Sequence, residues 1–155
     1  MTPAINALKK VGVAYQIHQY QHNEAAASYG LEAAEALGVK AAQVFKTLIV
    51  NLHPKSFAVA LVPVASQLSL KALALAAGGK SARMAEAREA ERVTGYVLGG
   101  ISPLGQKWRL VTVIDHSALT HAEIFVSGGR RGLDISVAPA DLIALTAATV
   151  ADITA

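Results

Sequence analysis

Two apolar segments joined by a tight turn most constrain what this chain can fold into. Residues 57–64 form an almost continuous apolar run, which is typical of a strand buried within a sheet. Residues 44–52 instead alternate, so Lys46 falls in an otherwise aliphatic row on one face of a strand. Because Pro54-Lys55-Ser56 separates the two segments, they predict a β-hairpin in the core of a sheet.

Short helices with start and stop signals interleave with the remaining strands. Thr2 and Pro3 are typical of a helix start, and Gly12 is typical of its end. The same signals predict helices over residues 31–37 and 85–93, from a Ser69 cap to Ala77, and from Pro139 onward, with strands over 13–21, 110–114, 123–127 and 133–137. No regular βαβ alternation and no linker is visible. Residues 1–155 are therefore predicted to form one α+β domain, in which helices surround a strongly curved, mostly antiparallel (mixed) sheet.

Composition excludes several classes of protein. A chain of 155 residues can bury one core without a covalent staple. It has no cysteine, which excludes disulfides, thiolate metal sites and a cysteine nucleophile. Neither a signal-peptide pattern nor an apolar run of ~18 to 20 residues is visible, so we expect a cytoplasmic protein with no membrane partner.

The histidines predict no metal or cofactor site. His18 and His22 have the four-residue spacing of a helical metal pair. On a strand, however, they would lie roughly 13 Å apart, too far to share an ion. The other three, His53, His116 and His121, form no better group.

Residues 95–105 interrupt the aliphatic pattern with four glycines and a proline. Glycine permits φ > 0 and close approach of another group, whereas Pro103 fixes φ and disfavours a helix before it. The spacing fits neither the dinucleotide-binding fingerprint, nor a phosphate-binding P-loop, nor the serine elbow of hydrolases. The segment is therefore either a ligand-binding loop or a tight connection between two core strands.

Basic residues gather in the second half of the chain, around the glycine-rich segments. The net charge is +3, and the clustered cations are Lys80, Arg83, Arg88, Arg92, Lys107, Arg109, Arg130 and Arg131. Contacts with phosphate would explain this clustering. Glu86, Glu89 and Glu91 interleave with part of it, a pattern that is typical of a solvated helix face.

Four segments occur together along nearly the whole chain: Met1-Thr2-Pro3-Ala4, Phe45-Lys46-Thr47-Leu48, Thr94-Gly95-Tyr96 with the loop that follows, and Val126-Ser127-Gly128-Gly129-Arg130-Arg131-Gly132-Leu133. In this order they resemble the YbaK/EbsC family of trans-editing aminoacyl-tRNA deacylases, relatives of the editing domain of bacterial prolyl-tRNA synthetase. Residues 23–28 and 107–109 differ from the family pattern, and they concern contacts with tRNA more than the pocket.

The resemblance implies hydrolysis of misacylated tRNA, with cysteine wrongly attached to proline tRNA as the usual substrate. It implies no cofactor, the aminoacylated acceptor end of tRNA as partner, and prolyl-tRNA synthetase as a further partner. In the implied mechanism the cysteinyl thiol attacks its own ester, and Lys46, the implied catalytic residue, positions the tRNA end or the aminoacyl group. The residues implied to bind the substrate are Tyr20, Thr47, Gly99, Gly100, Ile101, Ser102, Pro103, Ser127, Gly128 and Asp134.

Alternatives stay open for these residues and for the function. Lys46 could extend to a sheet edge, Asp134 could be a solvated strand residue, and Tyr20 could lie at a rim. Ser102 and Ser127 have no histidine assigned to them, so no Ser-His-Asp set is predicted. An alanyl-tRNA(Pro) deacylase that uses water is the nearest alternative, because a methyl-sized difference contributes only ~1 to 3 kcal/mol of discrimination. A non-catalytic module that binds tRNA or protein is the other.

Overall fold

The fold is described from a computed structural model, which describes residues 1–23 and 28–155. Most of the segment 23–28, which departs from the family pattern, lies outside the described residues. The helices are α1 (Pro3–Val11), α2 (Tyr29–Leu37), α3 (Leu70–Ala77), α4 (Ala87–Thr94) and α5 (Pro139–Thr146), with short 3-10 turns at Ala41–Gln43 and His116–Thr120. The strands are β1 (Tyr15–Gln19), β2 (Phe45–His53), β3 (Ser56–Pro63), β4 (Ser81–Met84), β5 (Val111–Asp115), β6 (Ile124–Arg130), β7 (Leu133–Val137) and β8 (Thr149–Ala151).

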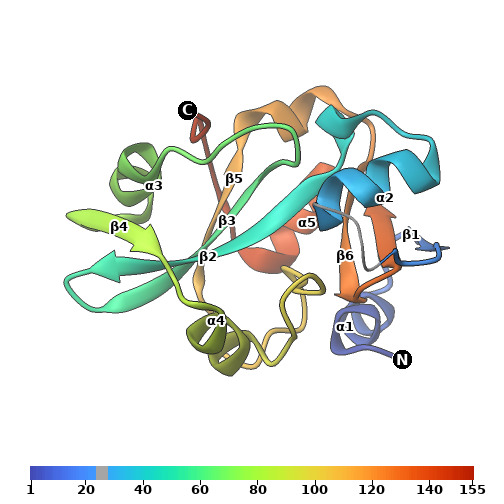
Figure 1. Cartoon of the computed structure of the whole chain (residues 1–155), viewed down its shortest axis with the longest axis horizontal. Coiled ribbons are helices and arrows are strands. Elements are labelled where there is room, and N and C mark those ends of the chain that lie inside the picture. Colours follow the sequence, from blue (N-terminus) through green and yellow to red (C-terminus); the bar gives the residue numbers. More distant parts are fainter. Residues whose placement is uncertain (24–27) are drawn as a thin grey trace.

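The strands form two sheets, which Figure 1 shows side by side. A three-stranded antiparallel sheet has the order β1-β7-β6, and a five-stranded mixed sheet has the order β4-β2-β3-β5-β8. In the second sheet β3, β5 and β8 run parallel to one another, and the other pairs are antiparallel. An isolated parallel bridge between Val44 and Phe125 joins the two sheets. The predicted α+β class is confirmed, and its sheet proves to be divided.

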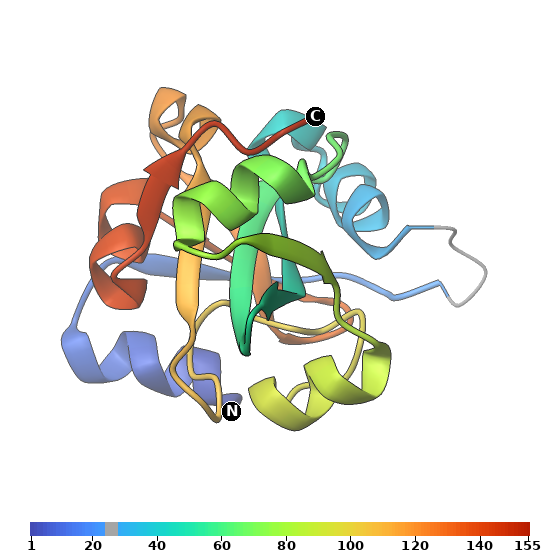
Figure 2. The same ribbon diagram turned by 90° about the vertical axis from the view of Figure 1, so that its left-hand side faces the viewer.

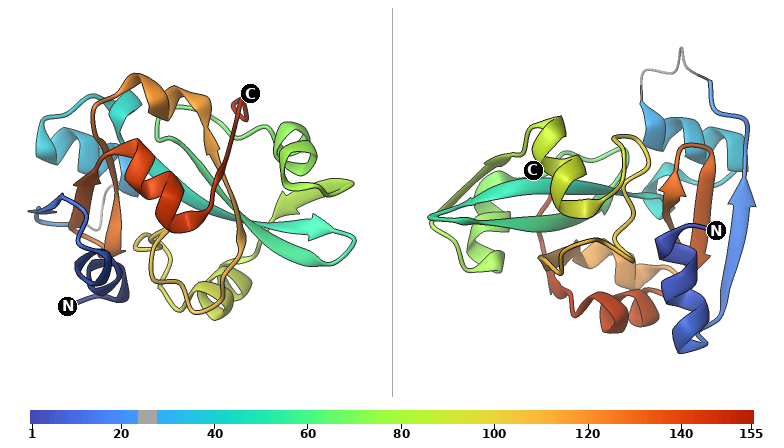
Figure 3. Two further views of the ribbon diagram at one scale, coloured as in Figure 1. Left: turned by 180° about the vertical axis from the view of Figure 1, so that it is seen from behind. Right: turned by 90° about the horizontal axis from the view of Figure 1, so that it is seen from below.

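The predicted hairpin lies at the centre of the larger sheet. β2 and β3 pair from Phe45 opposite Pro63 to Leu52 opposite Ser56. All of residues 58–62 on β3 are fully buried, as their continuous apolar run predicts. The turn of the hairpin and β1 lie at opposite ends of the molecule (Figure 3).

Helices cover both faces of the larger sheet. Phe45 and Ile49 of β2 pack in one core cluster with Ala90 and Val93 of α4. Leu52 and its neighbours on the other face of β2 pack with α3 in a second cluster. Figure 2 shows α3 and α4 on opposite sides of the β2–β3 hairpin. The alternating residues of 44–52 therefore face two different hydrophobic cores, one on each side of the sheet. Neither face of this strand is simply turned to solvent.

Capping side chains explain where the helices begin. Thr2 Oγ1 accepts a hydrogen bond from Ile5 N at 3.3 Å, and Gly12 ends α1 with φ +74°. α2 begins two residues before the predicted start because Ser28 Oγ accepts from Leu31 N at 3.3 Å. α4 begins two residues later than predicted, with Glu86 as its cap.

β4 and β8 were not predicted from the sequence. β4 is short and mostly exposed, and it pairs with the outer part of β2. β8 has three residues and, among the described strands, pairs with β5 alone. Neither strand is long enough to establish an alternating pattern of its own. Within the described residues, no helix is both long enough and apolar enough to cross a membrane.

Candidate functional site

A pocket of about 350 Å³ lies where the two sheets meet, under the N-terminal end of α2. β2 supplies one wall, β6 and β7 supply another, and the loop after α4 closes a third. The lining residues are Tyr20, Ser28, Tyr29, Gly30, Ala33, Val44, Phe45, Lys46, Thr47, Leu48, Val64, Leu98, Gly99, Ile101, Ser127 and Asp134. Seven of the residues named from the sequence, from four separate segments, are therefore brought together.

Lys46 carries a cation into this pocket. Its side chain is half-buried in the row that continues to Leu48 and Val50. Burial lowers the pKa of the Lys46 ammonium because desolvation disfavours the charged form. In the described part of the chain no carboxylate forms an ion pair with Lys46. The ammonium is therefore available to an oxygen atom of a ligand.

Asp134 is the acidic group of the pocket and lies on the opposite sheet. It is 5% exposed on β7, paired with Ser127 of β6 on one side and His18 of β1 on the other. Desolvation raises the pKa of Asp134 to about 7. Burial first, and then the negative charge of Asp134, raise the pKa of Tyr20 to about 12. Asp134 can therefore exchange a proton near neutral pH, whereas Tyr20 stays protonated.

Two hydroxyl groups add hydrogen-bonding capacity. Thr47 Oγ1 is buried and has no hydrogen-bond partner among the described residues. A buried hydroxyl without a hydrogen bond costs free energy. A ligand that formed a hydrogen bond with Thr47 Oγ1 would remove this cost and bind more tightly. Ser127 Oγ accepts a hydrogen bond from Gly129 N at 3.2 Å, at the point where the pairing of β6 with β7 becomes irregular. The ring of His18 hydrogen-bonds with Ser136 Oγ at 2.8 Å, and not with Ser102 or Ser127.

The mouth of the pocket is built around Gly99. This residue has φ +88°, and a Cβ there would lie 2.6 Å from Arg131 Nε and 3.0 Å from the ring of Tyr29. Arg131 Nε donates to Leu98 O at 3.0 Å, and its guanidinium lies 4.7 Å from the Tyr29 ring centroid. Sequence reasoning missed Tyr29. The signal that could have found it is the Ser28 cap, which makes Tyr29 the first residue of α2.

Four residues named from the sequence lie outside this pocket. A Cβ on Gly100 would lie 2.6 Å from Arg130 Cα, so Gly100 packs on backbone. Ser102 is fully buried, and its Oγ accepts from Leu104 N at 3.3 Å within the loop. Pro103 lines a separate cavity of about 250 Å³ beside Trp108. Gly128 packs against Leu133 and accepts a hydrogen bond from Thr2 through its carbonyl. These four residues instead shape the loops that hold the lining residues Gly99, Ile101 and Ser127.

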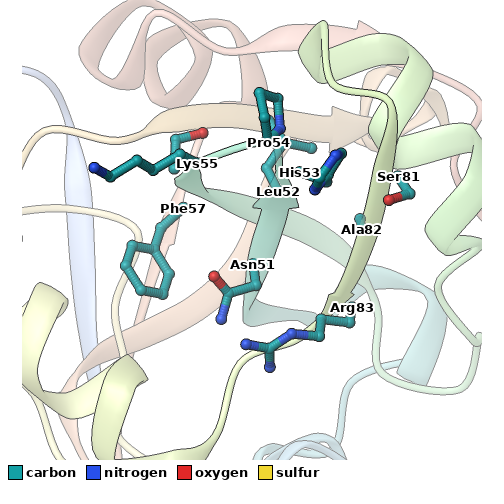
Figure 4. A pocket seen from close by; sticks show the side chains of 10 residues that line it. Asn51, Leu52, His53, Pro54, Lys55, Phe57, Ser81, Ala82 and Arg83 are labelled. Carbon is teal, nitrogen blue, oxygen red and sulfur yellow. The ribbon is translucent and has the colours of Figure 1, made fainter.

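Two other features could be mistaken for the site. An open cleft of about 470 Å³ lies at the end of the β2–β3 hairpin (Figure 4), and neither Lys46 nor Asp134 lines it. Asp115, His116 and Asp152 carry ligand atoms within 4.8 Å of one another. The carboxylate of Asp115, however, already accepts from Ser117 N and Ile153 N at 3.2 and 3.0 Å, which is a structural role.

Comparisons with known proteins find matches over most of the chain. A model of the aminoacyl-tRNA editing domain matches residues 23–145. EbsC of Enterococcus faecalis, described as a candidate Cys-tRNA(Pro)/Cys-tRNA(Cys) deacylase, is 34% identical over 153 residues, which are 99% of this chain and 93% of that protein. The solved structure of a candidate trans-editing enzyme for prolyl-tRNA synthetase has a TM-score of 0.86 and 27% identity, over 99% of this chain and 95% of that one. The solved structure of a hypothetical protein has a TM-score of 0.88 and 27% identity, and the match covers 99% of both chains.

Proposed function

Because this chain belongs to the aminoacyl-tRNA editing domain family, we propose that it hydrolyses the ester bond of misacylated tRNA as a free-standing deacylase. The observation that carries the proposal is the pocket that holds Lys46 and Asp134 on facing sheets. An aminoacyl ester is small and polar, and its carbonyl oxygen needs a donor while its reacting group needs a proton acceptor. The pocket offers both kinds of group.

Cysteinyl-tRNA of the proline type is the substrate we infer. The 34% identical relative EbsC is named for this ester, and the solved relative is named for trans-editing with prolyl-tRNA synthetase. A pocket of about 350 Å³ accommodates a small side chain together with the terminal ribose. Prolyl-tRNA synthetase would then act upstream, because it produces the ester that this pocket removes.

The substrate thiol is the nucleophile in the proposed reaction. Asp134, as a carboxylate with a pKa of about 7, takes the thiol proton, which suits a general base at neutral pH. The sulfur then attacks the ester carbon, so that a carbon–sulfur bond forms and the bond to the ribose oxygen breaks. Asp134 returns its proton to that oxygen. The resulting thiolactone is opened by water to give free cysteine.

Lys46 stabilises the negative charge in this scheme. Its ammonium donates a hydrogen bond to the ester oxygen on which charge develops, in a site that is partly shielded from water. Thr47 Oγ1 and Ser127 Oγ orient the aminoacyl group. Since Ser127 has no histidine beside it among the residues that line the pocket, we assign it to orientation and not to nucleophilic attack.

Single-turnover hydrolysis of cysteinyl-, seryl- and alanyl-tRNA(Pro) tests the proposal. We expect the cysteinyl ester to react much faster than the other two even at saturating protein, because a hydroxyl is a poorer nucleophile and a methyl group is none. If the alanyl ester reacted at a rate comparable to that of the cysteinyl ester, the nucleophile would be water and not the substrate thiol. An acyl-enzyme trapped on Ser127 would restore a serine hydrolase, and hydrolysis of none of the esters would leave a binding module.

A further inference from the structure

A continuous line of contacts leads from the mouth of the pocket to the β2–β3 hairpin. It starts at Arg131, whose Nε donates to Leu98 O. Leu98 N in turn donates to Glu91 Oε2 of α4 at 2.8 Å, so the loop at the mouth is fastened to this helix. Two residues earlier on α4, Glu89 accepts from Asn51 Nδ2 of β2 at 3.0 and 3.1 Å. α4 therefore connects the loop at the pocket mouth to the hairpin.

The hairpin end of this surface is a polar cleft. Phe57, Asn51 and Arg83 are opposite one another on β3, β2 and β4. Figure 4 shows their side chains projecting on the same side of the sheet. The guanidinium of Arg92 on α4 lies 5.8 Å from the ring centroid of Phe57. Lys55, in the hairpin turn, lines the same cleft of about 470 Å³ and is exposed.

Cations dominate this surface. We call Lys55, Arg83, Arg92 and Arg131 the basic track; all four are exposed. The nearby acids are largely engaged by the protein. Glu89 accepts from Asn51 and from the backbone N of Glu86 and lies 3.8 Å from Arg83, while Glu91 accepts from Leu98 N. These bonds direct the two carboxylates toward the protein, whereas the four cations of the track are exposed.

The length of the track fits a nucleic acid better than a small anion. From Thr47, which lines the pocket and shares a face of β2 with Asn51, to His53 at the hairpin, β2 extends about 20 Å at roughly 3.3 Å per residue. A stacked strand rises about 3.4 Å per nucleotide, so this distance passes the few unpaired nucleotides of an acceptor end and reaches its first base pairs. A substrate that reaches Thr47 in the pocket therefore has duplex phosphates available at the hairpin.

We propose that the basic track binds the phosphate backbone of the acceptor stem of the tRNA whose aminoacyl end occupies the pocket. The inference rests on the proposed function for its substrate and adds the surface that holds the duplex. Lys and Arg contacts to phosphate carry no sequence information, so the track anchors any acceptor stem and leaves the choice of tRNA to other contacts.

The test compares the triple variant Lys55→Gln/Arg83→Gln/Arg92→Gln with Lys71→Gln. Lys71 is an exposed cation on α3, on the opposite face of the sheet, and is the matched control. Two ligands are used: an uncharged tRNA, and a short single-stranded oligonucleotide with the same acceptor-end sequence. Binding is measured by fluorescence anisotropy over a range of salt concentrations, so the readout does not depend on ester hydrolysis.

We expect the triple variant to bind tRNA at least about fivefold more weakly and to lose about 0.9 from the salt slope for each duplex phosphate contact removed. Its affinity for the oligonucleotide and its thermal unfolding should match those of the Lys71→Gln control. Arg92→Lys, which keeps the charge, should bind tRNA nearly as well as the unchanged protein.

Equal affinity of the triple and control variants for tRNA would overturn the inference and leave the surface to a protein partner. Equal loss for tRNA and the oligonucleotide would also overturn it, because the track would then contact only the single-stranded end. If the unchanged protein binds tRNA through the track but hydrolyses no ester, the proposed function fails while the inference stands.

Discussion

Lys46 and Asp134 are both shifted toward their uncharged forms by burial in one pocket. Desolvation lowers the pKa of Lys46 and raises that of Asp134 to about 7. Two such groups that paired with each other would instead be held charged. Shifts of this kind, caused by burial in a pocket, are common at functional sites.

The first prediction at this scale concerns Lys46. Lys46→Met keeps most of the side chain's length but removes the ammonium, so single-turnover hydrolysis of cysteinyl-tRNA should fall by about 10²-fold or more. Thermal unfolding should be little changed, because the substitution leaves no large cavity. Lys71→Met is the matched control and should keep the full rate. A normal rate in Lys46→Met would mean that Lys46 merely extends along the pocket wall.

A second prediction follows from the raised pKa of Asp134. Between its ordinary pKa of 3.8 and the folded value of about 7, the unfolded chain loses this proton while the folded chain keeps it. The free energy of unfolding should therefore fall as pH rises through this window, by up to about 4 kcal/mol. Asp134→Asn cannot ionise, so it should lose this slope and be more stable than the unchanged protein at pH 8.

Urea unfolding between pH 4 and pH 8 measures this difference, with Asp152→Asn as the control because Asp152 is exposed. The hydrolysis rate of the unchanged protein should rise as Asp134 ionises near pH 7, and Asp134→Asn should lack this rise. Parallel stability profiles for Asp134→Asn and Asp152→Asn would show that Asp134 titrates normally in the folded protein.

The sequence predicted the placement of Lys46 in this site but not the burial of Asp134. The alternating pattern of residues 44–52 placed Lys46 correctly in the row with Leu48 and Val50. The position of Asp134 opposite Ser127 and His18 depends on the pairing of β7 with two other strands. Pairing between distant segments leaves no mark in the local period of a sequence, so the raised pKa of Asp134 could not be predicted from it.

At the scale of elements, the glycine-rich loop separates into a pocket face and a packing face. In Gly99→Ala the new methyl group displaces Arg131 from the mouth, so hydrolysis should fall sharply. In Gly100→Ala the methyl group meets the backbone of Arg130 at 2.6 Å, so stability should fall by about 1–3 kcal/mol. The two substitutions thus affect different measurements although the residues are adjacent.

Gly78→Ala controls for the backbone cost of Gly99→Ala. Gly78 has φ +82°, close to the φ +88° of Gly99, and a Cβ there meets nothing within 4 Å. Thermal unfolding and single-turnover rates of the three variants should show a similar loss of stability in Gly78→Ala and Gly99→Ala, with activity lost mainly in Gly99→Ala. Full activity in Gly99→Ala would mean that the mouth tolerates displacement of Arg131.

Elements with local signals were predicted better than elements without them. α3 occurs as predicted, with its Ser69 cap and its end at Gly78, because both signals lie within the helix's own sequence. β4 was missed because its four residues, Ser81–Met84, are mostly polar and exposed and form a strand only by pairing with β2. The same reason explains β8.

At the scale of the whole molecule, the class of fold was predictable and the division of its sheet was not. The number and order of helices and strands predict an α+β domain. Whether eight strands form one sheet or two depends on which distant strands pair, and here β1, β7 and β6 pair separately from the others. The pocket lies between these two sheets, so its overall shape could not be predicted from local sequence patterns either.

The isolated bridge between Val44 and Phe125 has a consequence for how this pocket can change during evolution. Lys46 and Thr47 lie on one sheet, whereas Ser127 and Asp134 lie on the other. The spacing between donor and proton acceptor is therefore set by the angle at which the sheets meet, and Val44 and Phe125 are buried at that joint. Substitutions there would widen or narrow the space for an acyl group while every polar side chain of the lining stays in place. A family built this way can acquire new amino acid specificities through apolar changes at this joint, with the polar lining unaltered.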